Sequence, residues 1–434
     1  EGAVSEKSWS DLDREIKSKL AAGGAVRIIT GTHLSPTASK AIGEFVARYP
    51  GTQVVQYDPV SSAALLEANE KTFGQRAVAD YSFDKADVIV SFGADFLGTW
   101  ISPIEYARQY AGNRRTSNIK KSRKMSRHYQ VESFMSLTGS NADSRILIKP
   151  SEQGAAICAL YNEVAALSGG GGIGGPKVND KAAASLKKVA KDLVAAQGRS
   201  LVVTGSNNVM EQIIVNKLNA MLGNLNNTVS FSSASNQRQG DERNIKRCID
   251  EMNGGQVAVA IVWGANPAYD LPFADQFAAA FAKVGTRISF SGILDETTLL
   301  CNYAAPAHHY LESWGDAEPK KGHYSLIQPT IAPLFKTRQA EHSLLEWADS
   351  ANLNRQDPQP YYQYLKSAWA GDMIGKQNKY ATPTAFWDMS VHDGILESDA
   401  AASSVSFNEG VSLDGGAVTK PGSSDVEIAF FETV

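Results

Sequence analysis

Short apolar runs that end in glycine alternate along the chain with segments of helical periodicity. Residues 25–30 form a β-type run closed by Gly31, and Ser35 then offers a helix N-cap before apolar residues recur at helical spacing. A second unit of the same kind has its first strand end at Gly205. Continuous apolar strands that alternate with helices predict parallel sheets covered on both faces. The expected fold class is therefore α/β, with two Rossmann-like parallel-sheet units.

The two units align with each other at nearly equal spacing. Residues 29–32 match residues 203–206, and residues 91–95 match residues 262–266. We interpret this as an internal duplication of a βαβαβ half. Ligands of such sheets bind at the carboxyl ends of the strands. The glycines at these predicted strand ends are Gly31, Gly93, Gly205 and Gly264.

The same pattern predicts five consecutive regions. They are a lead-in helix at 1–24, a first Rossmann-like unit at 25–167, a glycine-rich linker and helix at 168–199, a second Rossmann-like unit at 200–328, and an irregular C-terminal segment at 329–434 with helices at 339–352 and 361–369. The linker does not carry the Lys-Ser or Lys-Thr pair of a phosphate-binding loop, which favours a flexible connection. The end of the chain is rich in Gly, Ser and Asp and predicts a connection to a further domain.

Composition and charge exclude several classes of protein. The 434 residues carry 42 Lys and Arg against 46 Asp and Glu, a formal charge of −4, which argues against coating nucleic acid by electrostatics. Three cysteines, Cys158, Cys248 and Cys301, form no Cys-x-x-Cys pair, which argues against an iron–sulfur cluster or structural zinc within this chain. The longest purely apolar run, residues 257–263, is far shorter than the roughly 18 residues of a membrane span.

One stretch of the chain is strongly basic. Residues 108–127 hold eight Lys or Arg and no Asp or Glu. A solvated excursion explains this slightly better than an anion-binding or partner-facing surface does. If the stretch does face a partner, charge reversal at Lys120, Lys121, Arg123 and Lys124 is expected to weaken assembly at low salt.

Motifs of other enzyme classes are weak in this sequence. His308 and His309 lie beside Glu312 and Asp316, but adjacent histidines on regular structure point to different faces, so a polar loop is favoured over a metal site. Neither unit has Gly-x-Gly-x-x-Gly after its first strand, which disfavours NAD or FAD. An unrelated doubly wound nucleotide-binding protein stays open on the duplicated pattern alone.

An ordered series of short motifs resembles a known family. The motifs are Gly264-Ala265-Asn266-Pro267, Leu271-Pro272, Asp295-Glu296-Thr297-Thr298, Ala305-Pro306-Ala307 and Leu311-Glu312-Ser313-Trp314-Gly315-Asp316. In this order they resemble the guanine-dinucleotide half of molybdopterin oxidoreductases of the DMSO reductase family. Residues 86–95 resemble the matching half on the other side of the cofactor, and residues 142–150 the segment that closes it.

Longer strings resemble the B subunit of alternative complex III, over about residues 8 to 434. They are Tyr57-Asp58-Pro59-Val60, Asp95-Phe96-Leu97-Gly98-Thr99-Trp100, Met125-Ser126-Arg127-His128 through Ser136-Leu137-Thr138-Gly139, and Tyr324 to Ile331 with Pro333-Leu334-Phe335. This resemblance implies a membrane-bound quinol oxidoreductase of bacterial respiratory chains. Its B subunit joins a molybdopterin-enzyme-like domain, which has lost its molybdenum cofactor, to an iron–sulfur domain.

The resemblance carries further expectations about location and partners. The subunit is expected to lie peripherally on the periplasmic side of the bacterial inner membrane, exported by a Tat-type signal. Its partners would be haem c subunits and a quinol-binding membrane subunit, without nucleic acid. Iron–sulfur clusters are expected in a downstream domain outside this chain, which looks like the middle part of the subunit.

Two functional hypotheses follow from the resemblance. In the first, the segment holds no cofactor, metal or catalytic residue and braces the iron–sulfur domain and neighbouring subunits. A vestigial pterin-dinucleotide pocket would then include Gly31, Gly93, Asp95, Gly205, Gly264, Asn266, Glu296 and Thr297. The alternative is a catalytic molybdenum or tungsten bis-pterin subunit, similar to polysulfide or thiosulfate reductases. Against it, no Cys or Ser stands out as a metal ligand, and the Gly-Arg pair of active relatives is missing after Leu311 to Asp316.

Overall fold

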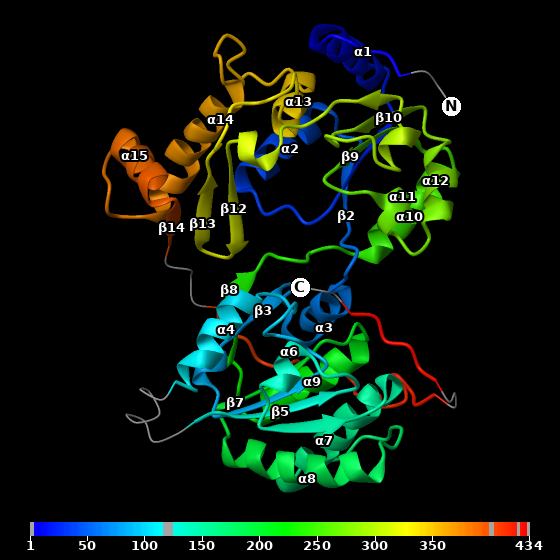
Figure 1. Ribbon diagram of the computed structural model, residues 1–434, viewed down its shortest axis with the longest axis vertical. Coiled ribbons are helices and arrows are strands. Elements are labelled where there is room, and N and C mark those ends of the chain that lie inside the picture. The colour runs from blue at the N-terminus through cyan, green and yellow to red at the C-terminus, as the bar shows by residue number, and fades with distance from the viewer. Residues whose placement is uncertain (1–3, 116–124, 399–402, 423–425, 432–434) are drawn as a thin grey trace. The chain divides into compact units, whose positions relative to one another are not determined.

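The computed structural model describes residues 4–115, 125–398, 403–422 and 426–431 (Figure 1). The chain folds into two compact units. Unit 1 comprises Glu1–Ser61 and Arg238–Asp399, and unit 2 comprises Ser62–Gln237 and Ala400–Val434. This division differs from the consecutive Rossmann-like units at 25–167 and 200–328 that the sequence predicts.

Unit 1 is built on a five-stranded parallel sheet with the strand order β11-β10-β9-β1-β2. The strands are β1 (Ala25–Thr30), β2 (Thr52–Gln56), β9 (Val257–Trp263), β10 (Thr286–Ser289) and β11 (Tyr303–Ala304). The covering helices are α1 (Trp9–Ala21), α2 (Pro36–Arg48), α10 (Glu242–Asn253), α11 (Pro267–Asp270), α12 (Ala274–Phe281) and α13 (Ala340–Trp347).

The two faces of this sheet have separate hydrophobic cores. Ile28 packs with α1, α2 and α13 on one face, and its neighbour Ile29 packs with α10 and α12 on the other. Successive side chains of a strand point to opposite faces, so a strand that is apolar throughout needs helices on both. The apolar runs read from the sequence therefore fold as predicted, into a sheet covered on both sides.

The remainder of unit 1 forms a smaller antiparallel layer. Its strands are β12 (Gly315–Lys320), β13 (His323–Ile327) and β14 (Ile395–Glu397), and its helices are α14 (Pro360–Ala368) and α15 (Pro383–Asp393). Trp369, Phe386 and Trp387 are buried between these elements. The C-terminal segment, for which the sequence predicts two helices in an otherwise irregular stretch, thus contributes to a core of its own.

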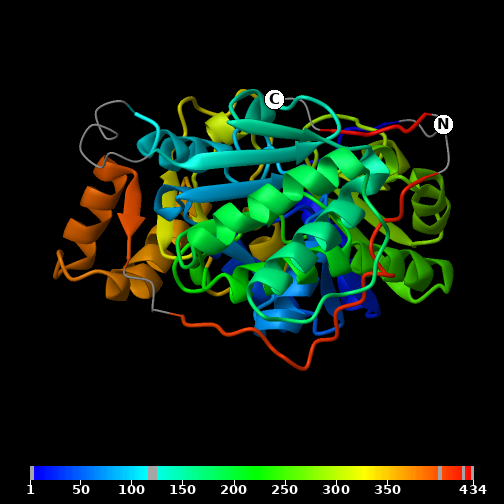
Figure 2. The same ribbon diagram turned by 90° about the horizontal axis from the view of Figure 1, so that it is seen from below.

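Unit 2 is built on a four-stranded parallel sheet with the order β6-β5-β4-β7. The strands are β4 (Val88–Phe92), β5 (Arg127–Glu132), β6 (Ser144–Leu147) and β7 (Ser200–Thr204). The core on one face includes α7 (Gln153–Leu167), α8 (Asp180–Ala195) and α9 (Val209–Met221), with α7 and α8 side by side (Figure 2). The core on the other face includes α3 (Ala63–Phe73), α4 (Pro103–Gly112) and the antiparallel pair β3 (Val78–Tyr81) and β8 (Val229–Ser235).

The duplicated strands pair across the predicted units rather than within them. β1 lies beside β9, and β4 lies beside β7. In each sheet, the first strand of one half of the duplication (β1 or β7) therefore lies beside the later strand of the other half (β9 or β4). For this reason each compact unit is formed from separate stretches of the sequence. Within the described ranges, no helix is both long and apolar enough to span a bilayer.

Candidate functional site

Two predicted glycines of unit 1 lie next to each other where β1 and β9 end. Thr30 pairs with Trp263 in the parallel ladder, so Gly31 and Gly264 follow at neighbouring positions. A Cβ atom on Gly31 would lie 3.5 Å from the carbonyl oxygen of Gly264. Gly264 itself has a φ of 61°, in the left-handed region that favours glycine. These glycines therefore close the carboxyl edge of the sheet, as predicted for a duplicated fold.

Asp58 ties down the loop that follows β1. Its Oδ1 accepts the Thr32 N–H at 3.0 Å, and its Oδ2 accepts the Thr32 hydroxyl at 2.7 Å and the Gly240 N–H at 2.8 Å. A side chain on Gly240 would collide with the Asp58 backbone. Sequence reasoning does not single out Asp58 as a site residue, although an aspartate directly after a strand is a signal for such a role. The Thr32 and Gly240 N–H groups, which could otherwise bind an anion, are therefore bound to a carboxylate of the chain.

His33 is the ionisable base of the loop that follows β1, and its side chain is uncharged at neutral pH. Burial lowers the pKa of His33 to about 4. Its Nε2 lies 2.6 Å from the Thr30 hydroxyl, and its ring packs against Trp263 with 4.3 Å between centroids. The side chain therefore contributes packing and a hydrogen bond to this edge and no positive charge.

Asn266, Glu296 and Thr297 form one hydrogen-bonded group. The Asn266 amide donates to Glu296 Oε2 at 2.7 Å, and its Oδ1 accepts from the Thr297 hydroxyl at 2.7 Å and from the Thr297 N–H at 3.2 Å. The hydrogen bond from Asn266 lowers the pKa of Glu296. The structure thus brings together the two loops predicted to face a nucleotide, but it pairs their polar groups with each other and leaves a carboxylate at the surface.

In unit 2 the glycines at the strand ends are packed more tightly. A Cβ on Gly205 would lie 2.7 Å from the carbonyl oxygen of Gly93, and one on Gly93 would lie 2.6 Å from Gln153 Oε1. Gly93 also has a positive φ of 60°. Glycine is needed here because backbone and side-chain atoms already fill the position of a Cβ.

Asp95 binds its neighbouring loop rather than facing open space. Its Oδ1 accepts the Thr138 hydroxyl at 2.6 Å and the Thr138 N–H at 2.9 Å. The same hydroxyl accepts the Leu97 N–H at 2.9 Å. This predicted pocket residue therefore joins the loop after β4 to α6 (Leu137–Ser140).

A row of buried polar side chains lies along β5, which the sequence analysis missed. His128, Gln130 and Glu132 alternate on the strand and are at most 3 % exposed. His128 Nε2 lies 3.2 Å from Gln130 Oε1, and the Gln130 amide donates to Glu132 at 3.2 Å. Glu132 also accepts from Arg145 Nε at 2.6 Å and from the Ser136 hydroxyl at 2.7 Å. The period-two spacing of the three polar residues is the signal that could have revealed this row.

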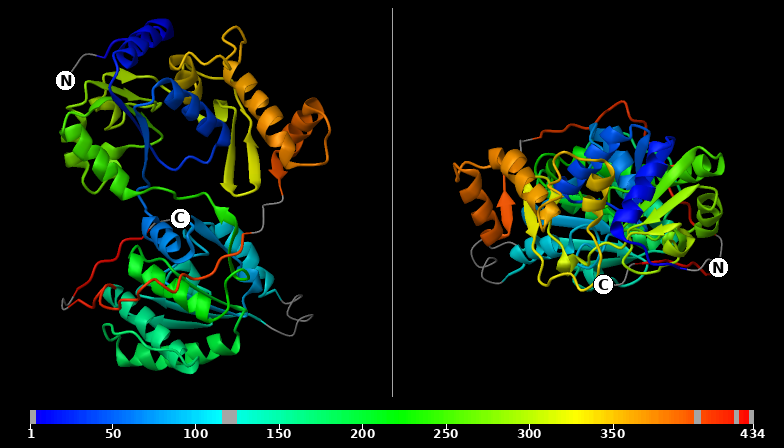
Figure 3. Two further views of the ribbon diagram at one scale, coloured as in Figure 1. Left: turned by 180° about the vertical axis from the view of Figure 1, so that it is seen from behind. Right: turned by 90° about the horizontal axis from the view of Figure 1, so that it is seen from above.

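A segment near the end of the chain covers the N-termini of two helices in unit 2. We call residues 403–422 and 426–431 the strap; it is the red segment in Figures 1 and 3. The side chain of Asn208, the N-cap of α9, accepts from the Met210 and Glu211 N–H groups and donates to the strap's Ala417 carbonyl. Glu211 in turn accepts the Thr419 N–H at 2.9 Å.

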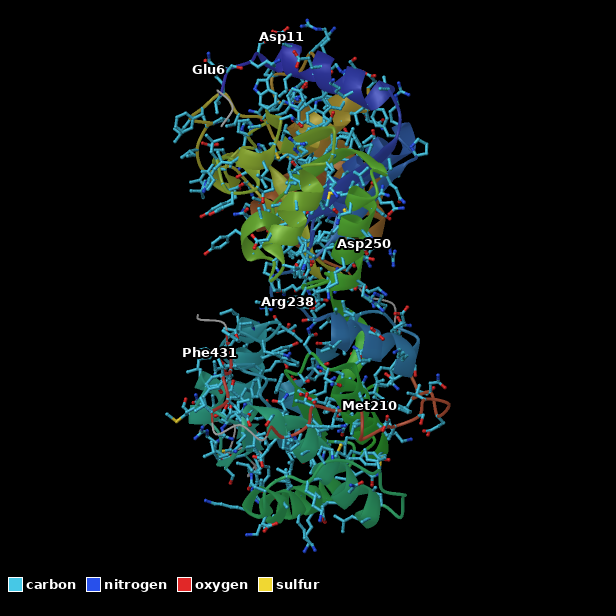
Figure 4. All side chains as sticks on the ribbon, turned by 90° about the vertical axis from the view of Figure 1, so that its right-hand side faces the viewer. Glu6, Asp11, Met210, Arg238, Asp250 and Phe431 are labelled. Atoms are coloured by element: carbon cyan, nitrogen blue, oxygen red, sulfur yellow. The ribbon has the colours of Figure 1, made fainter. Side chains whose placement is uncertain are left out.

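A carboxylate of the strap binds in front of α7. Glu427 accepts the Ser151 N–H at 2.9 Å and the Ser151 hydroxyl at 2.7 Å, and these hydrogen bonds lower its pKa. Earlier in the strap, the backbone nitrogen of Asp414 lies 3.4 Å from the sulfur of Met210 on α9. Figure 4 labels Met210 and, in the strap, Phe431. Helix N-termini bind anions because their first N–H groups lack partners within the helix. Here carboxylate and amide groups of the chain itself accept hydrogen bonds from these N–H groups.

The other candidate sites of the sequence do not assemble into metal centres. His308 binds the Thr337 hydroxyl at 2.6 Å, while His309 caps a short 3₁₀ helix and accepts the Leu311 N–H. In the part of the chain that the structure describes, no three His, Cys, Asp or Glu side chains are grouped to hold a metal ion. Cys158, Cys248 and Cys301 are free thiols.

Part of the basic stretch, residues 116–124 with Lys120, Lys121, Arg123 and Lys124, lies outside the described residues. On either side of that part, Arg114 pairs with Asp143 at 2.7 Å and Arg127 with Asp192 at 2.9 Å. These flanking arginines are therefore neutralised by the unit that carries them.

The fold places the chain in a known structural class. It is an α/β protein with Rossmann-like parallel sheets, and its fold is similar to that of acetylene hydratase from Pelobacter acetylenicus. That likeness has a TM-score of 0.61 at 11% sequence identity and covers 91% of this chain and 64% of the hydratase chain.

A shorter sequence match points to a particular relative. Over 89 residues, 20% of this chain, the sequence is 37% identical to the menaquinone reductase, molybdopterin-binding-like subunit of Nitratidesulfovibrio vulgaris (strain Hildenborough). The match covers 13% of that subunit, so the chain spans less than two thirds of either protein. No protein-family model matches the chain.

Proposed function

We propose that this chain is a cofactor-free, structural domain of the molybdopterin-oxidoreductase type within a respiratory quinol or quinone oxidoreductase. The fold supports the type of domain, and the partial similarity to a menaquinone reductase subunit supports the respiratory setting. The more specific assignment rests on the resemblance to the B subunit of alternative complex III. On that assignment the domain lies on the periplasmic side of the inner membrane and braces an iron–sulfur domain, with haem c and quinol-binding subunits as neighbours.

The cofactor-free proposal rests on one observation. In both units, side chains of the chain itself bind backbone N–H groups at the carboxyl edge of the sheet that could otherwise bind an anion. In unit 1, Asp58 binds the Thr32 and Gly240 N–H groups. In unit 2, Asn208 binds the first N–H groups of α9, and Glu427 binds Ser151 before α7. A pterin dinucleotide brings a diphosphate that needs such donors. The carboxylates of Asp58 and Glu427 would repel a diphosphate, and the Asn208 side chain already accepts the first N–H groups of α9, so these residues do not fit the cofactor.

The direct test is elemental analysis of the intact native complex for molybdenum, tungsten and iron. We expect iron without stoichiometric molybdenum or tungsten. The iron measured in the same sample serves as the control that electron-transfer groups were retained during purification. Molybdenum or tungsten near one atom per copy of this chain would contradict the proposal and favour a catalytic bis-pterin subunit.

A second test uses guanosine diphosphate as a probe of the sheet edges. Calorimetric titration of the full chain should show no saturable binding. Glu427→Gln removes the charge in front of α7 and keeps the shape, while Glu409→Gln, an exposed strap residue paired with Lys217, is the matched control. Tight binding by the unaltered chain would contradict the proposal. Binding gained only by Glu427→Gln would support it, because the carboxylate would then be what replaces the phosphate.

A further inference from the structure

The sheet of unit 1 has an open edge at β2. β2 is the outermost strand, paired only with β1 in this sheet. The Tyr57 N–H donates to the Thr30 carbonyl, and the Val26 N–H donates to the Gly51 carbonyl. In a parallel ladder alternate residues direct both backbone groups to the neighbouring strand. These two bonds therefore place Gln53 and Val55 toward β1 and Thr52, Val54 and Gln56 toward the outside.

Val54 presents both of its backbone groups at this edge. Its register partner is Ile28, but its own N–H and C=O point away from β1. Among the described residues neither group has a hydrogen-bond partner. The next outward carbonyl, that of Gln56, accepts the Asp241 N–H at 3.1 Å. The far end of β2 is therefore closed by the chain itself, and the open part is centred on Val54, a residue that is 40% exposed.

A groove of about 290 Å³ runs along this open part. One wall is the edge of β2, with Gln53, Val54 and Val55. The other wall is one face of α10, with Asn244, Arg247 and Glu251 at helical spacing. In Figure 4 the label Asp250 marks the same helix. An extended segment laid in this groove would meet backbone groups on one side and polar side chains on the other.

The charges in the groove leave one cation in excess. Glu251 is bound by Arg27 at 2.8 Å, and the Arg27 side chain is only 6% exposed, so this pair is neutral and fixed. Arg247 is exposed and has no acidic partner in the described parts of the chain. The groove therefore favours a segment that carries a carboxylate.

We propose that β2 accepts an extended, acidic segment of a partner subunit as an additional strand. Val54 would exchange two backbone hydrogen bonds with that segment, and Arg247 would bind one of its Asp or Glu side chains. Strand addition at an exposed edge is an established mode of peptide recognition, with backbone bonds supplying affinity and side-chain pockets supplying specificity. The existence of partner subunits rests on the proposed function, whereas the binding surface lies within unit 1 and is independent of whether a cofactor binds.

The test measures binding of a fluorescein-labelled hexapeptide of alternating Val and Glu to the full chain by fluorescence anisotropy. Val54→Pro removes the outward N–H, which proline tolerates at a sheet edge, and leaves the β1 ladder intact. We expect it to weaken binding about fivefold, the equivalent of one lost hydrogen bond. Arg247→Glu should weaken binding about tenfold or more, because a charge-assisted bond becomes a repulsion.

Matched variants separate strand addition from unspecific attraction. Val54→Ala keeps the backbone N–H, and Lys246→Glu makes the same charge change on α10 outside the groove lining, so both should bind within about twofold of the unaltered chain. An N-methylated peptide of the same sequence, which cannot pair as a strand, should not bind. The proposal is overturned if that peptide binds equally well, if Val54→Pro and Val54→Ala behave alike, or if no saturation occurs below about 1 mM.

Discussion

The carboxyl edges of the two parallel sheets carry the same strand-then-glycine motif but are closed in different ways. In unit 1 a Cβ on Gly31 would meet its nearest neighbour at an ordinary 3.5 Å, and a Cβ on Gly264 would meet nothing within 4 Å. In unit 2 the corresponding positions at Gly93 and Gly205 are filled at 2.6 and 2.7 Å. The same local sequence therefore supports a roomy edge in one unit and a packed edge in the other, because the surrounding elements differ.

The largest expected difference in stability is between an alanine variant of Glu132 in unit 2 and one of Glu296 in unit 1. Glu132 is 3% exposed and binds Arg145, Ser136 and Gln130. Glu132→Ala would leave buried donors without an acceptor and should lower the free energy of unfolding by about 3 kcal/mol. Glu296→Ala removes only a surface hydrogen bond and should have little effect. Chemical denaturation of both variants would measure this, and equal losses would show that the two edges are equally rigid.

The glycines give the next contrast. Gly205→Ala would push a methyl group against the Gly93 backbone, which cannot move as a side chain could. We expect a loss of about 2 kcal/mol in the free energy of unfolding. Gly31→Ala, in the matched position of unit 1, should change stability by no more than about 0.5 kcal/mol. If Gly31→Ala is the more damaging of the two, the proposed difference between the edges is wrong.

Sequence patterns predicted the pieces of this fold better than their assembly. The strands that end before Gly31, Gly93, Gly205 and Gly264 and the covered parallel sheets follow from local periodicity and turn residues. The middle strand β5 was not predicted, because its polar residues interrupt the apolar pattern. The pairing of β1 with β9 did not follow, because two similar halves offer two consistent ways to pair. The Asp58 contact with Gly240 and the strap contacts were also missed, because each joins residues far apart in the sequence. The polar row on β5 was missed although its period-two spacing is local.

The stability of unit 1 is expected to depend on pH through Glu341, a residue of α13. Burial raises the pKa of Glu341 to about 7, and the nearby Asp316 charge adds to the shift. The folded state therefore holds this proton more tightly than the unfolded state, whose carboxyl has the ordinary value of 4.5. The resulting stability is present below pH 4.5 and is lost as pH rises through 7. Glu341→Gln should abolish this loss, which amounts to about 3 kcal/mol between pH 4 and pH 8, in denaturant titrations over that range. An unchanged slope would contradict the prediction.

The smallest contrast concerns two surface ion pairs. Lys217 binds Glu409 of the strap at 2.6 Å and also lies over the Phe407 ring, 4.7 Å from its centroid. Lys40 binds Asp372 in unit 1 at 2.7 Å with both side chains largely exposed. A half-buried lysine that adds a ring contact holds its partner better than an exposed pair, which solvent and salt screen. Lys217→Ala should therefore cost about 0.5–1 kcal/mol and loosen the strap, whereas Lys40→Ala should cost less than about 0.5 kcal/mol. Hydrogen exchange of strap amides provides the measurement, because faster exchange confined to the strap in Lys217→Ala distinguishes a loosened strap from a general loss of stability.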